Sequence, residues 1–310
     1  MKIRTVFGIL LSLALLFIIF IQLLVILGIF ISRQDRGVPF ITSVGVIEIT
    51  GTIMSSDQTL GHLKKAEENN FIKGVILKIN SRGGAIGPCQ EIYDKLINYK
   101  KPVVIYIQGL GASGGYYIAS SCENIVAERG AITGSIGVLF HSLYFEETMK
   151  KLGIGETVVK SGKFKDAGSI TRHLTEEEYK YFQGVIDELY LQFVKDIAFG
   201  RKQRWLKLYP ELKDLKDEEY INRFRKIFKD EIDGRVFTGG EAFNKGFIDK
   251  LGTFDTAIDL MKDILDIKED PNLIFYRNYD HDKFKFFGLS LFNNKITNPL
   301  PPGFYYLMRW

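Results

Sequence analysis

The sequence is poor in the residues that usually build metal sites. It has two cysteines, Cys89 and Cys122, and neither belongs to a CxxC pair. Two thiols make no metal framework, and both lie in apolar helical surroundings, so we expect them to be buried packing residues. The four histidines are scattered without metal-ligand spacing. We therefore expect neither a metal nor a cofactor.

The sequence also lacks a large excess of either basic or acidic residues. The 41 basic and 37 acidic residues give a net charge of +4 over 310 residues. This excess is too small and too dispersed to indicate a nucleic-acid partner. The sequence shows no internal repeat and no low-complexity tract, so we expect neither a repeat array nor a nucleic-acid-binding protein.

Charged residues are absent from one stretch of 26 residues, between Val6 and Ile31. As a helix it would be about 39 Å long, whereas the hydrocarbon core of a bilayer is about 30 Å thick. A cleaved signal peptide would have a shorter apolar region and a small-x-small cleavage site, which is missing here. The stretch predicts one uncleaved transmembrane helix.

Basic residues flank this stretch almost equally, with Lys2 and Arg4 before it and Arg33 and Arg36 after it. A short N-terminal stub ahead of a large folded domain favours an orientation with the stub on the cytoplasmic side. We expect a single-pass protein of the cell membrane, with its N-terminus cytoplasmic and its larger domain outside the cytoplasm.

The chain after the anchor alternates between strand and helix patterns, which predicts an α/β fold with a mostly parallel sheet. Expected strands are Val44–Thr50, Gly74–Ile79, Val103–Ile107 and Asn124–Ala127, the last followed by a Gly-rich turn to Ile136–Leu139. Expected helices are Gln58–Asn69, Pro88–Tyr99 and Ser113–Ser121.

A long helix is expected after Thr175, a plausible N-cap followed by three glutamates. Residues Arg201–Lys229 are charged and aromatic without strand signals, which indicates a helical insertion. We therefore divide the chain into 1–37 (stub, anchor and tether), 38–267 (the main domain) and 268–310 (a C-terminal tail). Pro301 and Pro302 precede an apolar, extended end of this tail.

Three motifs carry residues suited to chemistry. Asn80–Gly84 follows a strand, and its two glycines allow backbone N–H groups to point into a site. Ser113 follows another strand within GLGASGGYY, where small neighbours let a substrate backbone approach. Lys165, in SGKFKD, would act as a base only in surroundings that favour its neutral form. Each motif alone also has a plain structural interpretation: a tight turn, an N-cap and a solvated lysine.

Together these motifs resemble signal peptide peptidase A, also called protease IV, in its short single-domain form. The resemblance covers roughly Val44 to Leu265 and is carried by five strings in the family's order: INSRGGAIGPCQEIYDKL, GLGASGGYYIAS, AITGSIGVLF, KSGKFKDAGSITRHLTEEE and GRVFTGGEAFNKGFIDKLG. It implies a Clp protease/crotonase-like core of repeated strand–helix units behind one transmembrane helix.

The resemblance also implies a serine endopeptidase with a Ser–Lys dyad. It places the nucleophile at Ser113, the general base at Lys165, a lysine-orienting hydroxyl at Ser135, and an oxyanion hole at the backbone N–H groups of Gly84 and Gly114. Such a site would attack a carbonyl with serine, pass the proton through lysine and hold the oxyanion with fixed N–H groups.

By the same resemblance, the substrates are released signal peptides and other small or membrane-associated peptides. The partners are the membrane and further copies of the chain in a ring or dome. Two features depart from the family: Arg82 stands where members usually have proline, and the segment Arg201–Lys229 is longer than expected.

Three alternatives remain open from the residues. The first is an inactive scaffold of the same fold, although Ser113, Lys165, Ser135 and both glycines are all present. The second is crotonase-like acyl-CoA chemistry, which needs no Ser–Lys pair. The third is a Ser–His hydrolase that uses His141 or His173.

Overall fold

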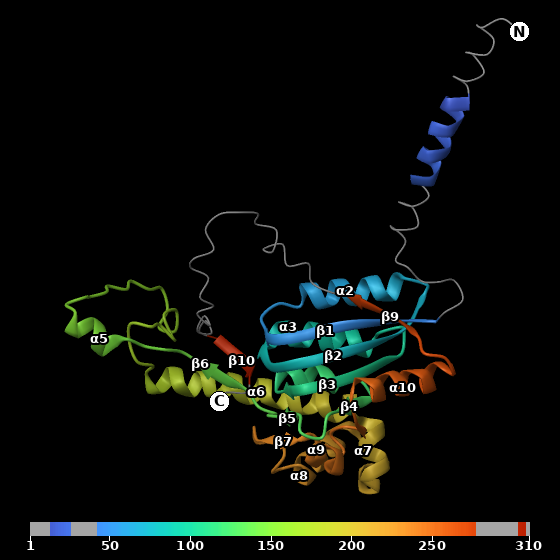
Figure 1. Ribbon diagram of the computed structural model, residues 1–310. Coiled ribbons are helices and arrows are strands. Elements are labelled where there is room, and N and C mark those ends of the chain that lie inside the picture. Colours follow the sequence, from blue (N-terminus) through green and yellow to red (C-terminus); the bar gives the residue numbers. More distant parts are fainter. Residues whose placement is uncertain (1–12, 26–41, 277–302, 308–310) are drawn as a thin grey trace, which may run out of the picture.

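The structure is a computed structural model, and it describes residues 13–25, 42–276 and 303–307 (Figure 1). Ten strands form one sheet. They are β1 (Ser43–Ile53), β2 (Ile72–Ala85), β3 (Val103–Ala112), β4 (Ile125–Ala127), β5 (Ile132–Gly134), β6 (Leu139–His141), β7 (Val236–Thr238), β8 (Lys250–Leu251), β9 (Asn272–Tyr276) and β10 (Gly303–Leu307).

The centre of the sheet is parallel, as predicted. Strands β9, β1, β2, β3, β4 and β8 pair in this order in parallel, and β5 continues the edge of β3 in parallel. Three pairs are antiparallel: β7 with β5, and β10 with both β2 and β6. The four expected strands from Val44–Thr50 to Asn124–Ala127 correspond to β1, β2, β3 and β4. The segment Ile136–Leu139 connects β5 to β6, and its last residue, Leu139, is the first residue of β6.

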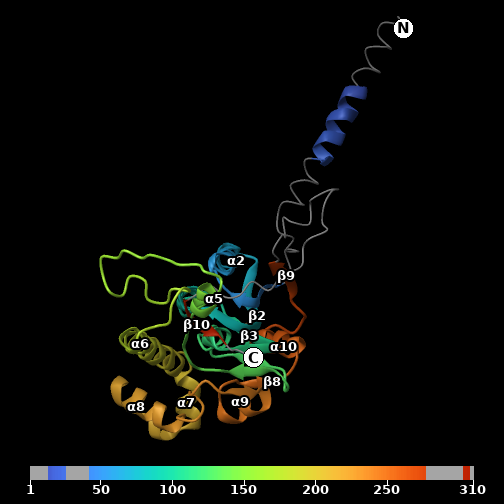
Figure 2. The same cartoon turned by 90° about the vertical axis from the view of Figure 1, so that its left-hand side faces the viewer.

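Helices cover both faces of the sheet (Figures 1 and 2). They are α2 (Asp57–Glu68), α3 (Ile86–Ile97), α4 (Gly114–Ala119), α5 (Glu146–Lys151), α6 (Glu176–Gly200), α7 (Lys202–Leu208), the 3-10 helix η1 (Pro210–Leu212), α8 (Asp217–Ile227), α9 (Gly239–Lys245) and α10 (Phe254–Leu265).

The apolar strand sequences follow from this burial on two faces. Leu77 and Ile105 pack in the larger core with α3, α4 and α6, whereas Ile76 and Val104 pack with Met261 of α10 on the other face. A strand buried on both faces reads as a continuous apolar run, which explains the run GVILKI in β2.

The long helix α6 begins where the sequence predicted. Thr175 is its N-cap: the Glu178 backbone N–H donates to the Thr175 hydroxyl, and the Thr175 N–H donates to the Glu178 carboxylate at 2.9 Å. This reciprocal pair satisfies two of the backbone N–H groups that a helix start leaves unpaired. The position of α6 matters below, because the segment that carries Lys165 leads directly into it.

The predicted helical character of Arg201–Lys229 is confirmed by α7, η1 and α8. Most of its aromatic residues are fully buried, among them Trp205, Tyr220 and Phe224. The Arg201 side chain, also buried, donates to Asp249 at 2.8 Å and to the carbonyls of Cys122 and Glu123. The segment is therefore part of the main hydrophobic core.

Both cysteines are buried free thiols, as expected. Burial raises the pKa of Cys89 to about 12 and that of Cys122 to about 11. Thiols that stay protonated are poor nucleophiles, which fits packing residues.

The predicted anchor is only partly within the described residues. Residues 13–25 are helical and exposed, whereas the rest of the stretch from Val6 to Ile31 lies outside the described residues. Among the described helices, none combines the length and the hydropathy needed to cross a membrane. The anchor stays a prediction.

Candidate active site

Ser113 has an unusual backbone at the junction of β3 and α4. Its φ is 52° and its ψ is −118°, a region that residues other than glycine rarely adopt and that costs about 1–3 kcal/mol. The side chain is buried, and its hydroxyl has no hydrogen-bond partner among the described residues. A strained residue with an unpaired buried hydroxyl is a candidate nucleophile, because strain of this kind clusters at functional sites.

Ser135 lies beside Ser113. Ala112 of β3 pairs with Gly134 of β5, and each serine is the next residue along its own strand. The Ser113 backbone N–H donates to the Gly134 carbonyl at 2.7 Å, which fixes this junction. Ser135 also has a φ of 52° and is buried. The structure therefore brings these two predicted site residues together.

Gly84 lies near the end of β2, where only glycine fits. A Cβ at this position would stand 1.9 Å from the Ile53 carbonyl oxygen of β1. A Cβ at Gly115 would stand 2.8 Å from the Ser81 carbonyl oxygen, so α4 also approaches the β2 end closely. These two contacts place the predicted oxyanion positions Gly84 and Gly114 at the same edge of the sheet as Ser113.

Arg82, the departure from the family pattern, does not interrupt β2. The turn is held by Ser81, whose hydroxyl donates to the Gly51 carbonyl at 2.6 Å and accepts from the Gly83 N–H at 3.0 Å. Arg82 itself is half-buried. A serine side chain thus supplies the local restraint in a turn that lacks proline.

The tail strand β10 occupies the neighbouring position in the sheet. Tyr306 pairs antiparallel with Gly84, and the flanking residues pair with Gly83 and Ala85. On its other side β10 pairs with Leu139–His141 of β6. Figure 1 shows β10 in this position. The part of the tail that the structure describes is therefore a strand of the sheet that lies beside Gly84; residues 308–310 lie outside the described residues.

A cavity of about 530 Å³ lies along β6. Its apolar lining includes Leu139 and Phe140 of β6 together with Phe182 and Ile186 of α6. Phe140 and Phe182 stack with ring centroids 4.3 Å apart. Polar and charged residues, among them Ser142, Arg172 and His173, also line the cavity. A cavity beside a strand position can hold side chains of an extended peptide.

Lys165 is not joined to these residues in the structure. Its side chain is exposed, and it forms no hydrogen bond or ion pair among the described residues. It lies in a series of turns between α5 and α6, where its backbone N–H donates to the Gly162 carbonyl at 3.1 Å. Three of the four predicted parts of the site meet at one edge of the sheet, and the predicted base stands apart from them.

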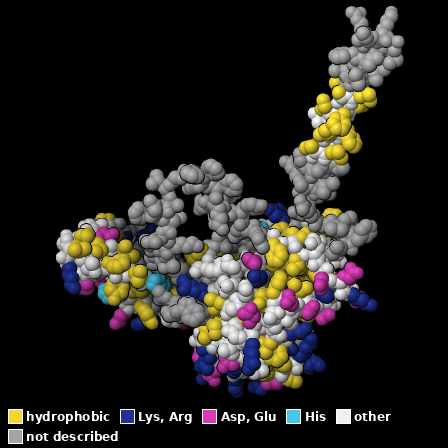
Figure 3. Space-filling view, viewed as in Figure 1, with side chains coloured by type: hydrophobic (Ala, Val, Ile, Leu, Met, Phe, Trp, Pro, Cys, Tyr) yellow, Lys and Arg dark blue, Asp and Glu magenta, His cyan; other side chains and the backbone are white. Residues whose placement is uncertain are grey.

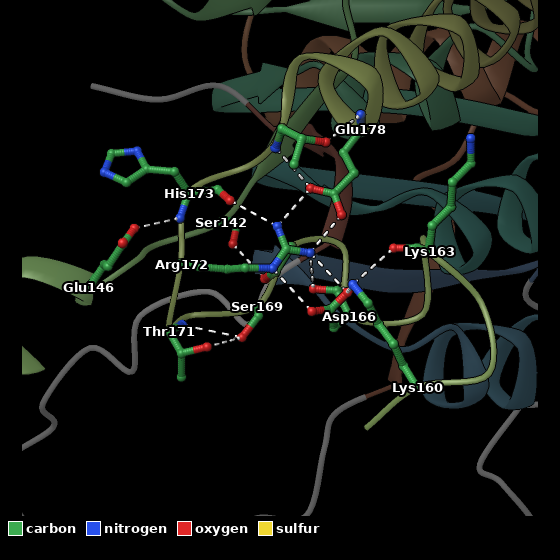
Figure 4. A network of polar contacts seen from close by, with 12 residues as sticks. Ser142, Glu146, Lys160, Lys163, Asp166, Ser169, Thr171, Arg172, His173 and Glu178 are labelled. Atoms are coloured by element: carbon green, nitrogen blue, oxygen red, sulfur yellow. Dashed lines mark hydrogen bonds and ion pairs between the residues drawn. The ribbon is translucent and has the colours of Figure 1, made fainter. Parts of the chain in front are cut away.

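The neighbours of Lys165 form a polar cluster that sequence reasoning missed (Figure 4). Asp166 accepts hydrogen bonds from Lys160 and Arg172, and Arg172 also binds Glu178. These partners hold the pKa of Asp166 well below its usual range and lower that of Glu178 to about 2. The spacing of Thr175 and Glu178 as a capping box was the one local signal for this cluster.

Neither candidate histidine is hydrogen-bonded to Ser113. His173 is exposed and lies against Tyr144, with ring centroids 3.8 Å apart. The His141 backbone pairs with Gly303 of β10. Because the Ser113 hydroxyl has no described partner, no Ser–His pair is formed in the part of the chain that the structure describes.

Comparison with known proteins decides the family. The profile of peptidase family S49 matches residues 95–210, and that of Clp protease matches residues 42–135. A candidate protease of Synechocystis sp. is 36% identical over 256 residues, which is 77% of this chain and 85% of the relative. The chain belongs to peptidase family S49.

Other S49 relatives support this assignment. A candidate signal peptide peptidase SppA of Enterococcus faecium is 32% identical over 263 residues, covering 82% of this chain and 69% of the relative. A candidate protease of Methanocaldococcus jannaschii is 35% identical over 216 residues, 69% of this chain; the alignment spans 63% of that relative's length. The expected family and its Clp protease-like fold are confirmed.

Proposed function

We propose that this S49 protein is a membrane-anchored serine endopeptidase that uses Ser113 as nucleophile and Lys165 as general base. The observation that carries the proposal is the position of β10: an extended segment lies antiparallel to Gly83–Ala85, beside a buried and strained serine. A peptide bound in this manner receives main-chain hydrogen bonds from the strand and side-chain selection from neighbouring cavities.

In the proposed reaction, Ser113 Oγ attacks the carbonyl carbon of the scissile bond while Lys165 Nζ accepts the hydroxyl proton. The N–H groups of Gly84 and Gly114 stabilise the oxyanion, and the lysine then protonates the leaving amine. Water, deprotonated in turn by the lysine, releases the acyl group from serine. Ser135 is suited to orient the lysine because it lies beside Ser113.

The exposed position of Lys165 sets a requirement for this mechanism. Either the segment that carries it closes onto Ser113, or a second copy of the chain supplies the lysine. Mixing Ser113→Ala with Lys165→Ala separates these routes: recovered activity identifies a dyad shared between copies, and an inactive mixture identifies closure within one copy.

Assembly into a homo-oligomer is part of the proposal. Residues 142–174, here called the arm, extend away from the sheet and carry exposed apolar side chains (Figures 1 and 3). They include Leu143, Tyr144, Phe145, Leu152, Ile154 and Val159. Such an apolar surface is more extensive than isolated exposed residues and fits contact with another copy. Light scattering of the fragment starting near Val38 tests this, and a monodisperse monomer at micromolar concentration would refute it.

The proposed substrates are released signal peptides and other small or membrane-associated peptides. The apolar part of the cavity beside β6, which includes Phe140, Phe182 and Ile186, suits apolar side chains. The predicted anchor would keep the domain at the membrane, outside the cytoplasm. We propose no nucleic-acid partner and no cofactor.

The central experiment is labelling by a serine-reactive fluorophosphonate, combined with cleavage of an unstructured apolar peptide. Wild-type protein should be labelled, Ser113→Ala should lose both label and cleavage, and Lys165→Ala should lose cleavage to the same extent, since groups acting as a unit are not additive. Lys163→Ala should change little. Normal turnover by Ser113→Ala would refute the nucleophile, and a stronger effect of Lys163→Ala would refute the assigned base.

A further inference from the structure

The segment between α5 and α6 has no regular structure of its own across residues 152–175. Ordering a residue in such a segment costs about 1–2 kcal/mol of backbone entropy, so specific contacts must hold it. Lys165 lies near the middle of the segment. The contacts nearest to it are therefore the ones that decide where its amine is presented.

Arg172 makes those contacts, with Asp166 next to Lys165 and with Glu178 at the start of α6 (Figure 4). Its Nε and Nη2 atoms bind the two carboxylate oxygens of Asp166 at 3.1 and 2.9 Å, and Nη2 also donates to the Asp166 main-chain carbonyl at 3.3 Å. Asp166 is the residue directly after Lys165. Both the side chain and the backbone next to the predicted base are thus held by one guanidinium.

The same guanidinium is fixed to the start of α6. Nη1 and Nη2 donate to the two carboxylate oxygens of Glu178 at 2.8 and 2.6 Å. Glu178 is buried, and its carboxylate also accepts the N–H of the N-cap Thr175. A planar guanidinium can serve two carboxylates in this manner, whereas a lysine ammonium cannot reproduce the fork.

A third contact joins the segment to the proposed peptide position. The Ser142 hydroxyl, directly after β6, donates to the Gly168 carbonyl at 2.9 Å. A Cβ at Gly168 would stand 3.1 Å from the Phe140 ring of β6. The residues after Lys165 are therefore fixed both to α6 and to the strand that pairs with β10.

We propose that Arg172 is a positioning residue of this peptidase: through Asp166 and Glu178 it fixes the segment that presents Lys165 to Ser113. This inference rests on the proposed function, and it assigns to Arg172, Asp166 and Glu178 a role that the family motif does not. It holds whether the serine belongs to the same copy or to a second one, because the contacts lie within one chain.

The charges around Lys165 allow a test by the direction in which the pH profile of kcat/KM moves in each variant. Those of the cluster are Lys160, Asp166, Arg172 and Glu178, which alternate in sign; the nearby ion pair between Lys163 and Glu177 is exposed. In Arg172→Gln, the positive charge that offsets the Asp166 carboxylate is gone. The carboxylate then favours the charged form of the Lys165 amine. The rise of kcat/KM with pH should then move to higher pH. In Asp166→Asn, the carboxylate is gone while Arg172 and Lys160 stay, so the rise should move to lower pH.

The experiment measures kcat, KM and the pH profile for wild type, Arg172→Gln, Arg172→Lys and Asp166→Asn, each corrected for the fraction labelled by fluorophosphonate. Lys163→Gln is the matched control, since it removes an ion pair two residues from Lys165 on the exposed side. We expect Arg172→Gln to lower kcat by about tenfold or more, because small misplacements of a catalytic group are costly. Arg172 also lines the cavity beside β6, so KM is measured separately as the report on peptide binding. Arg172→Lys should restore only part of the rate.

Opposite pH shifts in the two variants, absent in Lys163→Gln, support the positioning role. Identical profiles in all variants, or a loss limited to folded yield, overturn it and leave a purely structural cluster. Failure of the proposed function is a separate result: wild-type protein would then neither cleave the peptide nor react with fluorophosphonate.

Discussion

Ser113 and Ser135 lie side by side because each follows one residue of the β-strand pair Ala112 and Gly134, and both have a φ of 52°. Neighbouring strands are about 4.8 Å apart, so the two hydroxyl-bearing residues share one edge of the sheet. Two non-glycine residues in this conformation store strain at one place. The first prediction uses this strain.

Replacing Ser113 by glycine should abolish cleavage and stabilise the fold. Glycine adopts a positive φ without steric cost, which removes strain of about 1–3 kcal/mol, while its own entropy cost is about 0.5–1 kcal/mol. We expect a net gain of about 1 kcal/mol over Ser113→Ala, which keeps the strain. Thermal unfolding of both variants measures the difference. Equal stability would show that the backbone of Ser113 carries no strain.

Replacing Gly84 by alanine should damage both folding and activity. Its Cβ would meet the Ile53 carbonyl oxygen at 1.9 Å, so strands β1 and β2 would have to separate. Overpacking of this kind typically costs about 1–3 kcal/mol. Gly87→Ala, three residues further on, is the control because a Cβ there meets no atom within 4 Å. Denaturant unfolding and peptide cleavage are the measurements, and equal behaviour of both variants would contradict the described approach of β1 to Gly84.

Truncating the chain after Asn298 should accelerate cleavage of small peptides. The deleted β10 pairs with Gly83–Ala85, the position proposed for substrates, and a segment of the same chain competes at high effective concentration. We expect KM to fall by about tenfold with kcat and the melting temperature little changed. A synthetic peptide of residues 299–310 should then inhibit the truncated protein competitively. If truncation lowers stability and leaves the rate per folded molecule unchanged, β10 is structural only.

Acid should weaken the cluster around Arg172. Arg172 lowers the pKa of Glu178 to about 2, below the usual value of about 4.3 for glutamate. A lowered folded-state pKa stabilises the fold above the unfolded-state pKa, and this contribution is lost as the pH falls from about 4.3 to about 2.

The melting temperature of Glu178→Gln should accordingly be lower than that of wild type at pH 6, and the difference should shrink toward pH 2. Glu177→Gln, next to it and exposed, is the control. A constant difference across this range would show that the ionised Glu178 does not contribute.

Much of the fold was accessible from the sequence because its signals are local. Continuous apolar runs predicted the central strands, which are buried on two faces. The N-cap Thr175 predicted the start of α6. The glycines around Ser113 indicated a tight junction of strand and helix, which Ser113 forms. The insertion was recognised as helical, but its part in the main core was not, because burial of Trp205 and Phe224 depends on residues distant in the chain.

The sequence by itself determined which residues were candidates for chemistry and which strands precede most of them. Only the tertiary structure decided their neighbours. Strand pairing placed Ser135 beside Ser113 and the tail beside Gly84. Lys165 is exposed and lies in a segment that Arg172 holds through Asp166. The physical reason is range: strand and cap signals act over a few residues, whereas pairing, burial and ion clusters join residues that the chain separates.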